Sequence, residues 1–143
     1  MHITFRQATE ADIPVLAHIR LAVKENVLSN PARITTQMYV DYLDLLGRGW
    51  VAEADGRIIG FSYAEKTDSS IWALFVLPEY EGHGAGKGLL DLAVAWLFSI
   101  GNNQVSLGTQ ADTRADAFYL AQGWSRGGML DASQVGYTLH RKM

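Results

Sequence analysis

The segment VLPEYEGHGAGKGLL, at positions 76–90, carries a glycine at every second position of its middle part. These glycines are Gly82, Gly84, Gly86 and Gly88. An apolar run typical of a strand precedes them and one typical of a helix follows. Glycine costs backbone entropy in a folded chain, so this alternation indicates a backbone that must approach something closely. A helix N-terminus offers free N–H groups and a partial positive charge, so the loop could bind a phosphate, with Lys87 adding a positive charge.

Two glycine-rich phosphate sites do not fit this spacing. A Walker loop has four residues between its first glycine and its Gly-Lys pair, and then Ser or Thr. Here three residues separate Gly82 from Gly86, and Gly88 replaces the hydroxyl residue. The dinucleotide pattern GxGxxG would end at Lys87 or Leu89. Two readings stay open for the loop alone: a helix N-terminus that binds a pyrophosphate, or a tight turn without a ligand.

The residues around the loop predict alternating strands and helices. The segment SIWALFV before the loop is nearly all apolar, which predicts a central strand. After the loop we expect a buried helix, a strand, a short helix and a final strand, at LLDLAVAWLF, QVSLGT, TRADAFYLAQGW and VGYTLHRK. The passage from Ile71 to Leu107 should be a right-handed crossover unit.

The first half of the chain adds strands and two helices to this plan. The pair Asp55-Gly56 between two apolar runs predicts a β-hairpin. ITFRQA predicts a first strand, and a capping-box pattern over residues 9–12 predicts a helix that runs toward residue 24. A second helix is expected from residue 35 or 36 to residue 46, where two glycines end it. No repeat or linker is visible, so we expect a single α/β domain over residues 1–143.

Composition narrows the class of protein further. The chain has 143 residues, of which 48% are hydrophobic and 19% charged, as is typical of a globular fold. The net charge is −3 and basic residues form no run, so we expect no nucleic-acid partner. The longest apolar stretch, residues 89–100, contains Asp91 and is too short for a bilayer, so we expect no membrane partner. Cysteine is absent, which excludes disulfides and cysteine-based zinc sites. We therefore expect no metal, and we expect a cytoplasmic location.

Two motifs resemble those of the GCN5-related N-acetyltransferase family. In VLPEYEGHGAGKGLL, the matching residues are Val76, Pro78, Gly84 and Gly86. In DTRADAFYLAQGW, they are Ala115, Phe118, Tyr119, Gly123 and Trp124. The order of the predicted elements is also similar to that family from end to end. The resemblance implies a mixed, mostly antiparallel central sheet, flanked by about four helices and splayed between its fourth and fifth strands.

The resemblance also implies acetyl-coenzyme A as co-substrate. The family's loop holds the pyrophosphate through backbone N–H groups, which here belong to Gly82, His83, Gly84, Ala85, Gly86 and Lys87. The pantetheine arm would pair with the edge of the preceding strand, at Leu74, Phe75 and Val76. Asp112 replaces a frequent asparagine of the second motif and could still accept a hydrogen bond from the cofactor. Glu81 replaces the usual glutamine or arginine, and its carboxylate is unfavourable near a pyrophosphate unless it faces solvent or pairs with a cation.

The implied reaction is direct attack of a primary amine on the thioester. Tyr119 is the candidate proton donor to the leaving thiolate, although it could simply pack against Phe118. A backbone N–H near Phe75 could stabilise the oxyanion. The general base is open: the nearby ionisable residues Glu65, Asp68 and His83 could equally be surface groups, and a water chain could serve instead.

The acceptor amine would belong to a small molecule or a peptide. Its site should be built by the first two helices and the segment between them, where Glu25 and Asn26 could attract an ammonium group or could only cap a turn. Trp72 could line this site or belong to the core. A regulatory module that binds coenzyme A without efficient catalysis is the alternative function, and a homodimer is possible.

Overall fold

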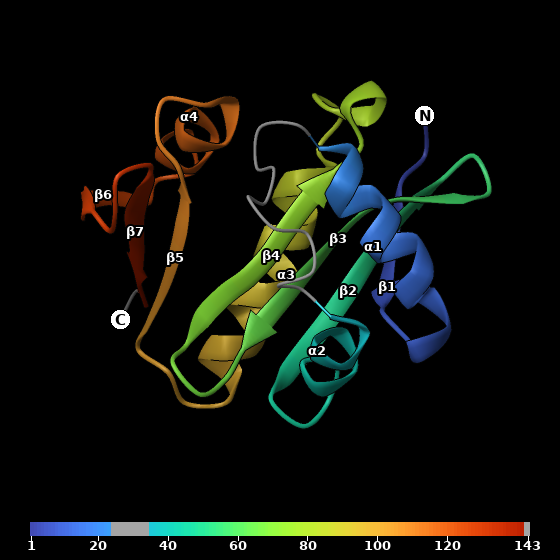
Figure 1. Cartoon of the computed structure of the whole chain (residues 1–143), viewed down its shortest axis with the longest axis horizontal. Coiled ribbons are helices and arrows are strands. Elements are labelled where there is room, and N and C mark those ends of the chain that lie inside the picture. The colour runs from blue at the N-terminus through green and yellow to red at the C-terminus, as the bar shows by residue number, and fades with distance from the viewer. Residues whose placement is uncertain (24–34, 142–143) are drawn as a thin grey trace.

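The computed structural model describes residues 1–23 and 35–141. Within them, the helices and strands follow the predicted order, with one additional strand near the C-terminus, and the strands form one mixed sheet (Figure 1). The strands are β1 Thr4–Gln7, β2 Gly47–Ala54, β3 Arg57–Glu65, β4 Ser70–Val76, β5 Gln104–Gln110, β6 Ser125–Met129 and β7 Gln134–His140. The α-helices are α1 Ile13–Ala22, α2 Thr36–Asp41, α3 Ala85–Ser99 and α4 Arg114–Ala121. Short 3-10 turns cover Glu10–Asp12 and Pro78–Tyr80.

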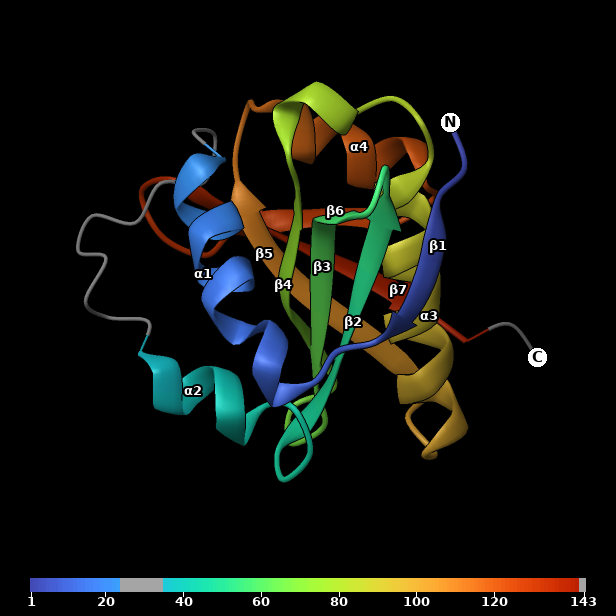
Figure 2. The same ribbon diagram turned by 90° about the vertical axis from the view of Figure 1, so that its right-hand side faces the viewer.

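The sheet has the order β1-β2-β3-β4-β5-β7-β6, with β4 at its centre. All neighbouring strands are antiparallel except β4 and β5, which are parallel, as the crossover through α3 requires. Helices α1 and α2 cover one face and α3 covers the other (Figure 2). One core cluster lies under α1 and α2, and a second joins the sheet to α3. The α/β fold with a mixed, mostly antiparallel sheet is therefore confirmed.

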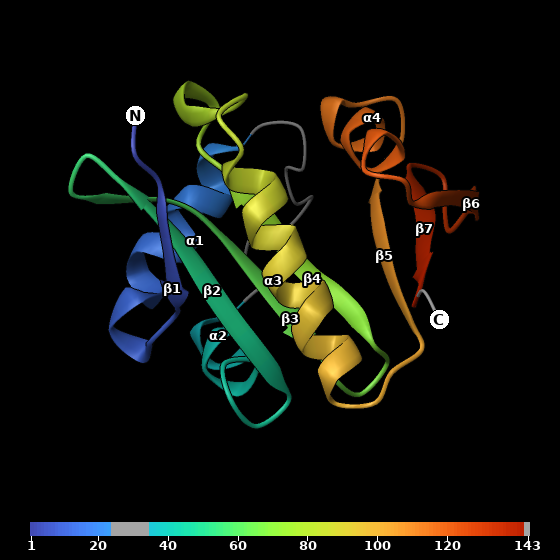
Figure 3. The same ribbon diagram turned by 180° about the vertical axis from the view of Figure 1, so that it is seen from behind.

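The strands β4 and β5 separate along most of their length. Their only register pair is Ser70 with Ser106, at the start of β4. Beyond this pair the two strands diverge, and α4 lies past the end of β5 (Figure 3). The predicted splay between the fourth and fifth strands is confirmed. It leaves one edge of β4 without a neighbouring strand, so the N–H and C=O groups of this edge can pair with another segment or a ligand.

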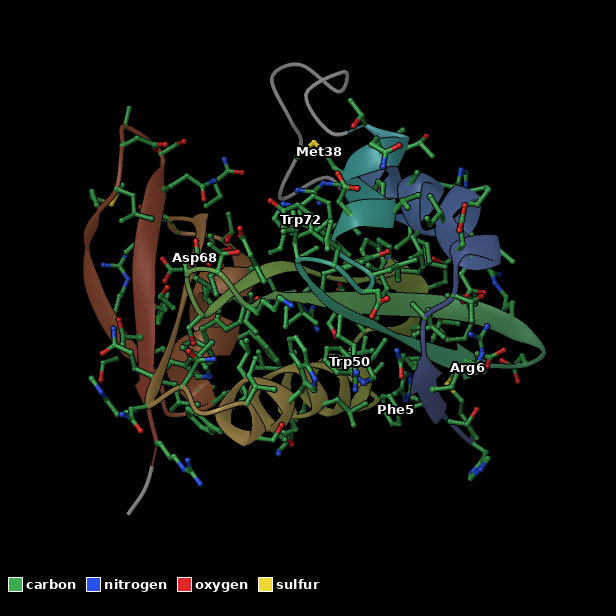
Figure 4. The ribbon with its side chains drawn as sticks, turned by 90° about the horizontal axis from the view of Figure 1, so that it is seen from below. Phe5, Arg6, Met38, Trp50, Asp68 and Trp72 are labelled. Atoms are coloured by element: carbon green, nitrogen blue, oxygen red, sulfur yellow. The ribbon has the colours of Figure 1, made fainter. Side chains whose placement is uncertain are left out.

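A bulge interrupts β4 close to this opening. Tyr63 pairs with Ala73 and Ala64 pairs with Ile71, so Trp72 between them has no partner on β3. A bulge bends the strand and redirects side chains. The Trp72 side chain lies on the side of α1 and α2, whereas that of Trp50 lies on the side of α3 (Figure 4).

Two predictions about the elements are wrong. The second helix ends at Asp41 instead of Leu46, and the glycines expected to end it begin β2. Gly47 is needed there for packing, because a Cβ atom at this position would lie 1.8 Å from the carbonyl oxygen of Ala64. The strand β6 was not expected at all, since its sequence SRGGM lacks the apolar alternation of a strand.

Several local predictions are confirmed. Asp55 and Gly56 both have positive φ values, 54° and 76°, and connect β2 to β3 as a two-residue hairpin turn. Thr35 caps α2 by accepting a hydrogen bond from the Met38 N–H. Gly123, with φ of 87°, follows the end of α4. None of the described helices is long and apolar enough to span a membrane.

Candidate active site

A groove opens where β4 and β5 diverge. It has a volume of about 380 Å³, which suits a ligand of organic cofactor size or part of one. One wall comes from β4 and the start of α3, and the other from α4. The lining includes Leu74, Phe75, Val76, Tyr80, Glu81, Gly82, Gly84, Ala85, Gly86, Lys87, Arg114, Phe118 and Tyr119. A narrower hollow shares Leu74, Phe75 and Tyr119 with the groove and continues along β4 to Trp72.

The glycine loop turns the start of α3 toward the groove. Gly82 and Gly84 have φ values of 80° and 90°, a backbone conformation that other residues rarely adopt. Gly84 is the N-cap of α3, so the N–H groups of the next residues have no carbonyl one turn earlier in the helix to bond. They are therefore available to an anion in the groove, where the helix dipole adds a partial positive charge.

The next two glycines in the alternation have different causes. At Gly86, a Cβ atom would meet Phe118 at 3.6 Å and Val76 at 3.8 Å, which is ordinary contact, so the glycine leaves free space in the groove. At Gly88, a Cβ atom would lie 2.3 Å from the Phe5 ring, so this glycine allows α3 to pack on β1. The alternating glycines therefore serve three purposes: a backbone conformation with positive φ, open space in the groove, and close packing of a helix on a strand.

Charged side chains at the mouth of the groove are paired. The Glu81 carboxylate lies 3.3 Å from Nε of Arg114, and thus joins the wall of the glycine loop to the wall of α4. Lys87 Nζ lies 2.8 Å from the carboxylate of Asp91, one turn further along α3. Glu81 therefore has the cation partner that its position near a pyrophosphate would require.

The exposed edge of β4 supplies backbone groups to the groove. Leu74, Phe75 and Val76 pair with β3 on one side only, opposite Ser62, Phe61 and Gly60. On the other side β5 has already diverged. The N–H and C=O groups on this side can therefore pair with an extended ligand that carries amide groups, as an added strand would.

Tyr119 lies at the base of the groove, where it is 6% exposed. Its ring contacts those of Phe118, Trp124 and Tyr137, with centroid distances of 5.2, 5.9 and 5.6 Å. Within the described residues its hydroxyl makes no hydrogen bond. Burial raises the pKa of the Tyr119 phenol above its ordinary value, so the group keeps its proton at neutral pH.

A buried carboxylate fixes the helix that carries Tyr119. Asp116 accepts hydrogen bonds from Arg126 Nε and Nη2, both at 3.0 Å, and from the Asp112 N–H at 2.8 Å. The Tyr137 hydroxyl also donates to this carboxylate. The hydrogen bonds from Arg126 are the main cause of the lowered pKa of Asp116. This network ties α4 to β6 and β7, and so sets the position of one groove wall.

The structure does not bring all the predicted site residues together. His83 and Asp112 are exposed and do not line the groove. The backbone N–H of Asp112 is used by Asp116. Glu25 and Asn26 lie outside the described residues. Glu65 and Asp68 lie at the opposite end of β4 from the glycine loop, where burial raises the pKa of Glu65 and its carboxylate accepts a hydrogen bond from Tyr42.

Trp72 belongs to an aromatic cluster below α2. Its ring stacks on Tyr42 at 4.8 Å and contacts Tyr39 and Tyr63 edge-on at 5.4 and 5.3 Å. It is nevertheless only partly buried, and it lines the narrow hollow as well as a second hollow with Asp68 on the other side of the opening. The aromatic contacts agree with a core position for Trp72, and its role in an acceptor site stays a prediction.

Two arginines near the groove were not identified from the sequence as candidate site residues. Arg114 lines it and pairs with Glu81. Arg20 lies over the rings of Trp72 and Phe75, behind the narrow hollow. Arg20 could have been noticed, because it follows the buried Leu16 by four residues and so places a charge on the apolar face of its helix.

Comparisons with known proteins agree with this geometry. The profile of the Acetyltransferase (GNAT) family matches residues 17–124. The chain is 30% identical over 134 residues to aminoglycoside N(6')-acetyltransferase type 1 from Stenotrophomonas maltophilia, with 85% of each chain covered. Its structure is similar to that of PaiA N-acetyltransferase from Thermoplasma acidophilum in complex with coenzyme A, with a TM-score of 0.84 and 19% identity over 99% of this chain and 100% of that one. YncA from Salmonella typhimurium with its cofactor acetyl-CoA gives a TM-score of 0.80 and 16% identity over 98% and 94%.

Proposed function

Because the chain belongs to the Acetyltransferase (GNAT) family, we propose that it transfers the acetyl group of acetyl-coenzyme A directly to a primary amine. The observation that carries this proposal is the start of α3. Its unpaired N–H groups open onto a groove that also exposes the free edge of β4. One ligand that has both a pyrophosphate and an amide-containing arm fits both features.

Acetyl-coenzyme A would lie along the groove in one direction. We assign its pyrophosphate to the backbone of residues 82–87, with Gly86 leaving the space that it occupies. The pantetheine arm would follow Leu74, Phe75 and Val76 along β4. Among structures of similar fold, PaiA was solved in complex with coenzyme A and YncA with acetyl-CoA, which supports acetyl-coenzyme A as the ligand. The same assignment leaves no direct role for the exposed side chains of His83 and Asp112.

The chemistry that these groups support is acyl transfer through a tetrahedral intermediate. A neutral amine attacks the thioester carbon, and its proton passes to a base or to water. The carbonyl oxygen then carries negative charge, which a backbone N–H near Phe75 can stabilise. As the C–S bond breaks, Tyr119 donates its proton to the leaving thiolate. The phenol carries its proton at neutral pH, although burial raises its pKa and so makes it a weaker acid than a free tyrosine.

Release of the thiol provides the test. Purified protein with acetyl-coenzyme A is mixed with amines of several classes, namely amino acids, polyamines, aminoglycosides and peptides with a free N-terminus. Aminoglycosides are included because the relative from Stenotrophomonas maltophilia is named for them. We expect at least one amine to accelerate thiol release. By mass spectrometry this amine should gain about 42 Da, because an acetyl group replaces one hydrogen atom on its nitrogen. Binding of acetyl-coenzyme A without release for any amine would favour the regulatory alternative.

A further inference from the structure

Arg20 holds a positive charge against the strand that carries the proposed thioester site. It lies near the end of α1, which packs on β3 and β4. Its guanidinium carbon is 4.8 Å from the centre of the Phe75 ring and 5.4 Å from that of Trp72. Both rings line the narrow hollow, as does Val23, which follows α1. The charge therefore sits on the α1 side of the sheet, where Figure 4 shows Trp72 pointing.

Two of the three guanidinium nitrogens of Arg20 lack the hydrogen bonds that a buried cation normally has. Arg20 Nε and Nη1 are inaccessible to solvent and have no partner, and no other buried side-chain nitrogen or oxygen in the described part of the chain is in this state. Desolvation by burial lowers the pKa of Arg20, and the charge interaction and side-chain hydrogen bond with Tyr39 partly offset this effect. No described carboxylate forms an ion pair with it, whereas Arg6 pairs with Asp12 and Glu53, and Arg126 pairs with Asp116.

Contact with the aromatic rings compensates for only part of this burial. A cation over an aromatic face is attracted by the ring, but the ring accepts no conventional hydrogen bond from Nε or Nη1. A buried polar group left without a partner destabilises the fold, and native proteins keep few of them. The arrangement is explained if the partner is a group that arrives with a ligand.

We propose that Arg20 binds a carboxylate of the acetyl acceptor, and that the acceptor is therefore a small amino acid-like amine. This inference rests on the proposed acetyltransferase function. The planar guanidinium offers two parallel N–H donors that match the two oxygens of a carboxylate. Arg20 as a whole is half-buried, so a carboxylate that pairs with it must displace the groups that cover Nε and Nη1. A polyamine, in contrast, would bring positive charge toward an uncompensated cation.

The test uses product analogues, so that it does not depend on turnover. N-acetyl derivatives of glycine, leucine, phenylalanine and glutamate are compared with the corresponding primary amides, by calorimetry in the presence of coenzyme A. We expect the wild-type protein to prefer the carboxylate form of at least one pair by about tenfold or more, the usual worth of a hydrogen bond to a charged group. Arg20→Met should abolish this preference, and Arg20→Lys should retain part of it.

Arg48→Met is the matched control. Arg48 also stacks on a tryptophan, with its guanidinium carbon 5.2 Å from the centre of the Trp96 ring, but it belongs to β2 and lies outside the groove. Arg48→Met should therefore leave the preference for carboxylates over amides unchanged. Should Arg20→Met fail to fold, Arg20→Gln and Arg20→Lys, which both keep a polar head group, provide the comparison.

Three outcomes would overturn the inference. The first is an equal affinity of the wild-type protein for carboxylates and amides. The second is a loss of affinity for coenzyme A itself in Arg20→Met, which would make Arg20 a cofactor ligand. The third is a stronger preference for sulfonate or phosphonate analogues, such as N-acetyltaurine, over carboxylates. Thiol release with amino acids, measured separately, tests the proposed function, so a failure of that function would not be confused with a failure of this inference.

Discussion

The Glu81 carboxylate and Arg114 Nε, 3.3 Å apart, join the two walls of the groove that the splayed sheet leaves open. Glu81 directly precedes the glycine loop, and Arg114 is the first residue of α4. Both side chains line the groove where the proposed pyrophosphate would lie. The carboxylate there has two opposing effects, since it orients a cation at the mouth and also repels an incoming anion.

Replacing Glu81 with glutamine should tighten the binding of acetyl-coenzyme A. The change removes the negative charge but keeps the shape, so the mouth of the groove repels the phosphates less. Because the pair is partly exposed, we expect a modest gain in affinity of about threefold to tenfold. Calorimetry at two salt concentrations measures it, and the gain should shrink at high salt. Glu79→Gln, an exposed carboxylate that does not line the groove, is the control. Equal affinities for both variants would place the pyrophosphate elsewhere.

Gly86→Ala should separate stability from cofactor binding. Gly86 lies in the first turn of α3 with an ordinary helical φ, and the added methyl group would meet neighbours at no less than 3.6 Å. Alanine in a helix interior is favoured over glycine by about 1 kcal/mol, so the melting temperature should stay the same or rise. The methyl group occupies the space assigned to the pyrophosphate, so affinity for acetyl-coenzyme A should fall. Affinity for pantetheine, which lacks the pyrophosphate, should not. A parallel loss for both ligands would contradict the assignment.

The parts of the site that the sequence predicted are those that depend on neighbouring residues in the chain. The hairpin at Asp55-Gly56, the cap at Thr35 and the glycine turn before α3 are all determined by backbone geometry over a few residues. The family motifs added the splay between β4 and β5, because one open edge is needed for the cofactor arm. These features together located the groove.

The parts that could not be predicted depend on contacts between distant segments. Gly47 looked like a helix end, but the close approach of Ala64 from β3 makes it part of a strand. The β6 segment is a strand only because β7 offers it an edge. Arg20 becomes a binding candidate only when α1 is placed over Trp72. Such relationships arise from the tertiary fold, and no local pattern encodes them.

Asp116→Asn should destabilise the protein in a way that depends on pH. The substitution removes the charge that Arg126 and Tyr137 contact, and we expect a loss of about 2–4 kcal/mol in the free energy of unfolding at pH 7. Because the folded-state pKa of Asp116 is lowered, its stabilisation is fully present above the unfolded value near 4 and is lost as pH falls toward the folded value. The difference between wild type and variant should therefore shrink below about pH 4.

Urea unfolding at pH 7 and at pH 3 measures this difference. Asp91→Asn is the matched control, since its pair with Lys87 is about as close but both side chains are about 60% exposed. Exposed pairs of this kind contribute about 0.5 kcal/mol or less, so this variant should resemble the wild type at both pH values. A difference for Asp116→Asn that stays constant between the two pH values would show that its charge is not what stabilises α4.

Tyr119→Phe tests the proton donor to the thiolate. The change removes one hydroxyl that makes no hydrogen bond among the described residues and keeps the ring against Phe118, Trp124 and Tyr137, so stability should change little. If the phenol protonates the leaving thiolate, kcat with a good amine should fall by roughly 10²–10⁴-fold. Affinity for acetyl-coenzyme A should remain close to that of the wild type, because the proton is needed only in the transition state.

Two comparisons distinguish this role from packing. An activated aryl thioester releases a thiolate that needs no proton, so the loss in Tyr119→Phe should be much smaller with that donor. Tyr137→Phe removes a hydroxyl from the same aromatic cluster, but one that donates to Asp116, so it should lower stability and leave kcat nearly unchanged. Because burial raises the pKa of Tyr119, the wild-type rate should not decline through loss of this proton up to about pH 9. Wild-type turnover in Tyr119→Phe would return the residue to the core, and a loss of affinity in proportion to rate would make it a binding residue.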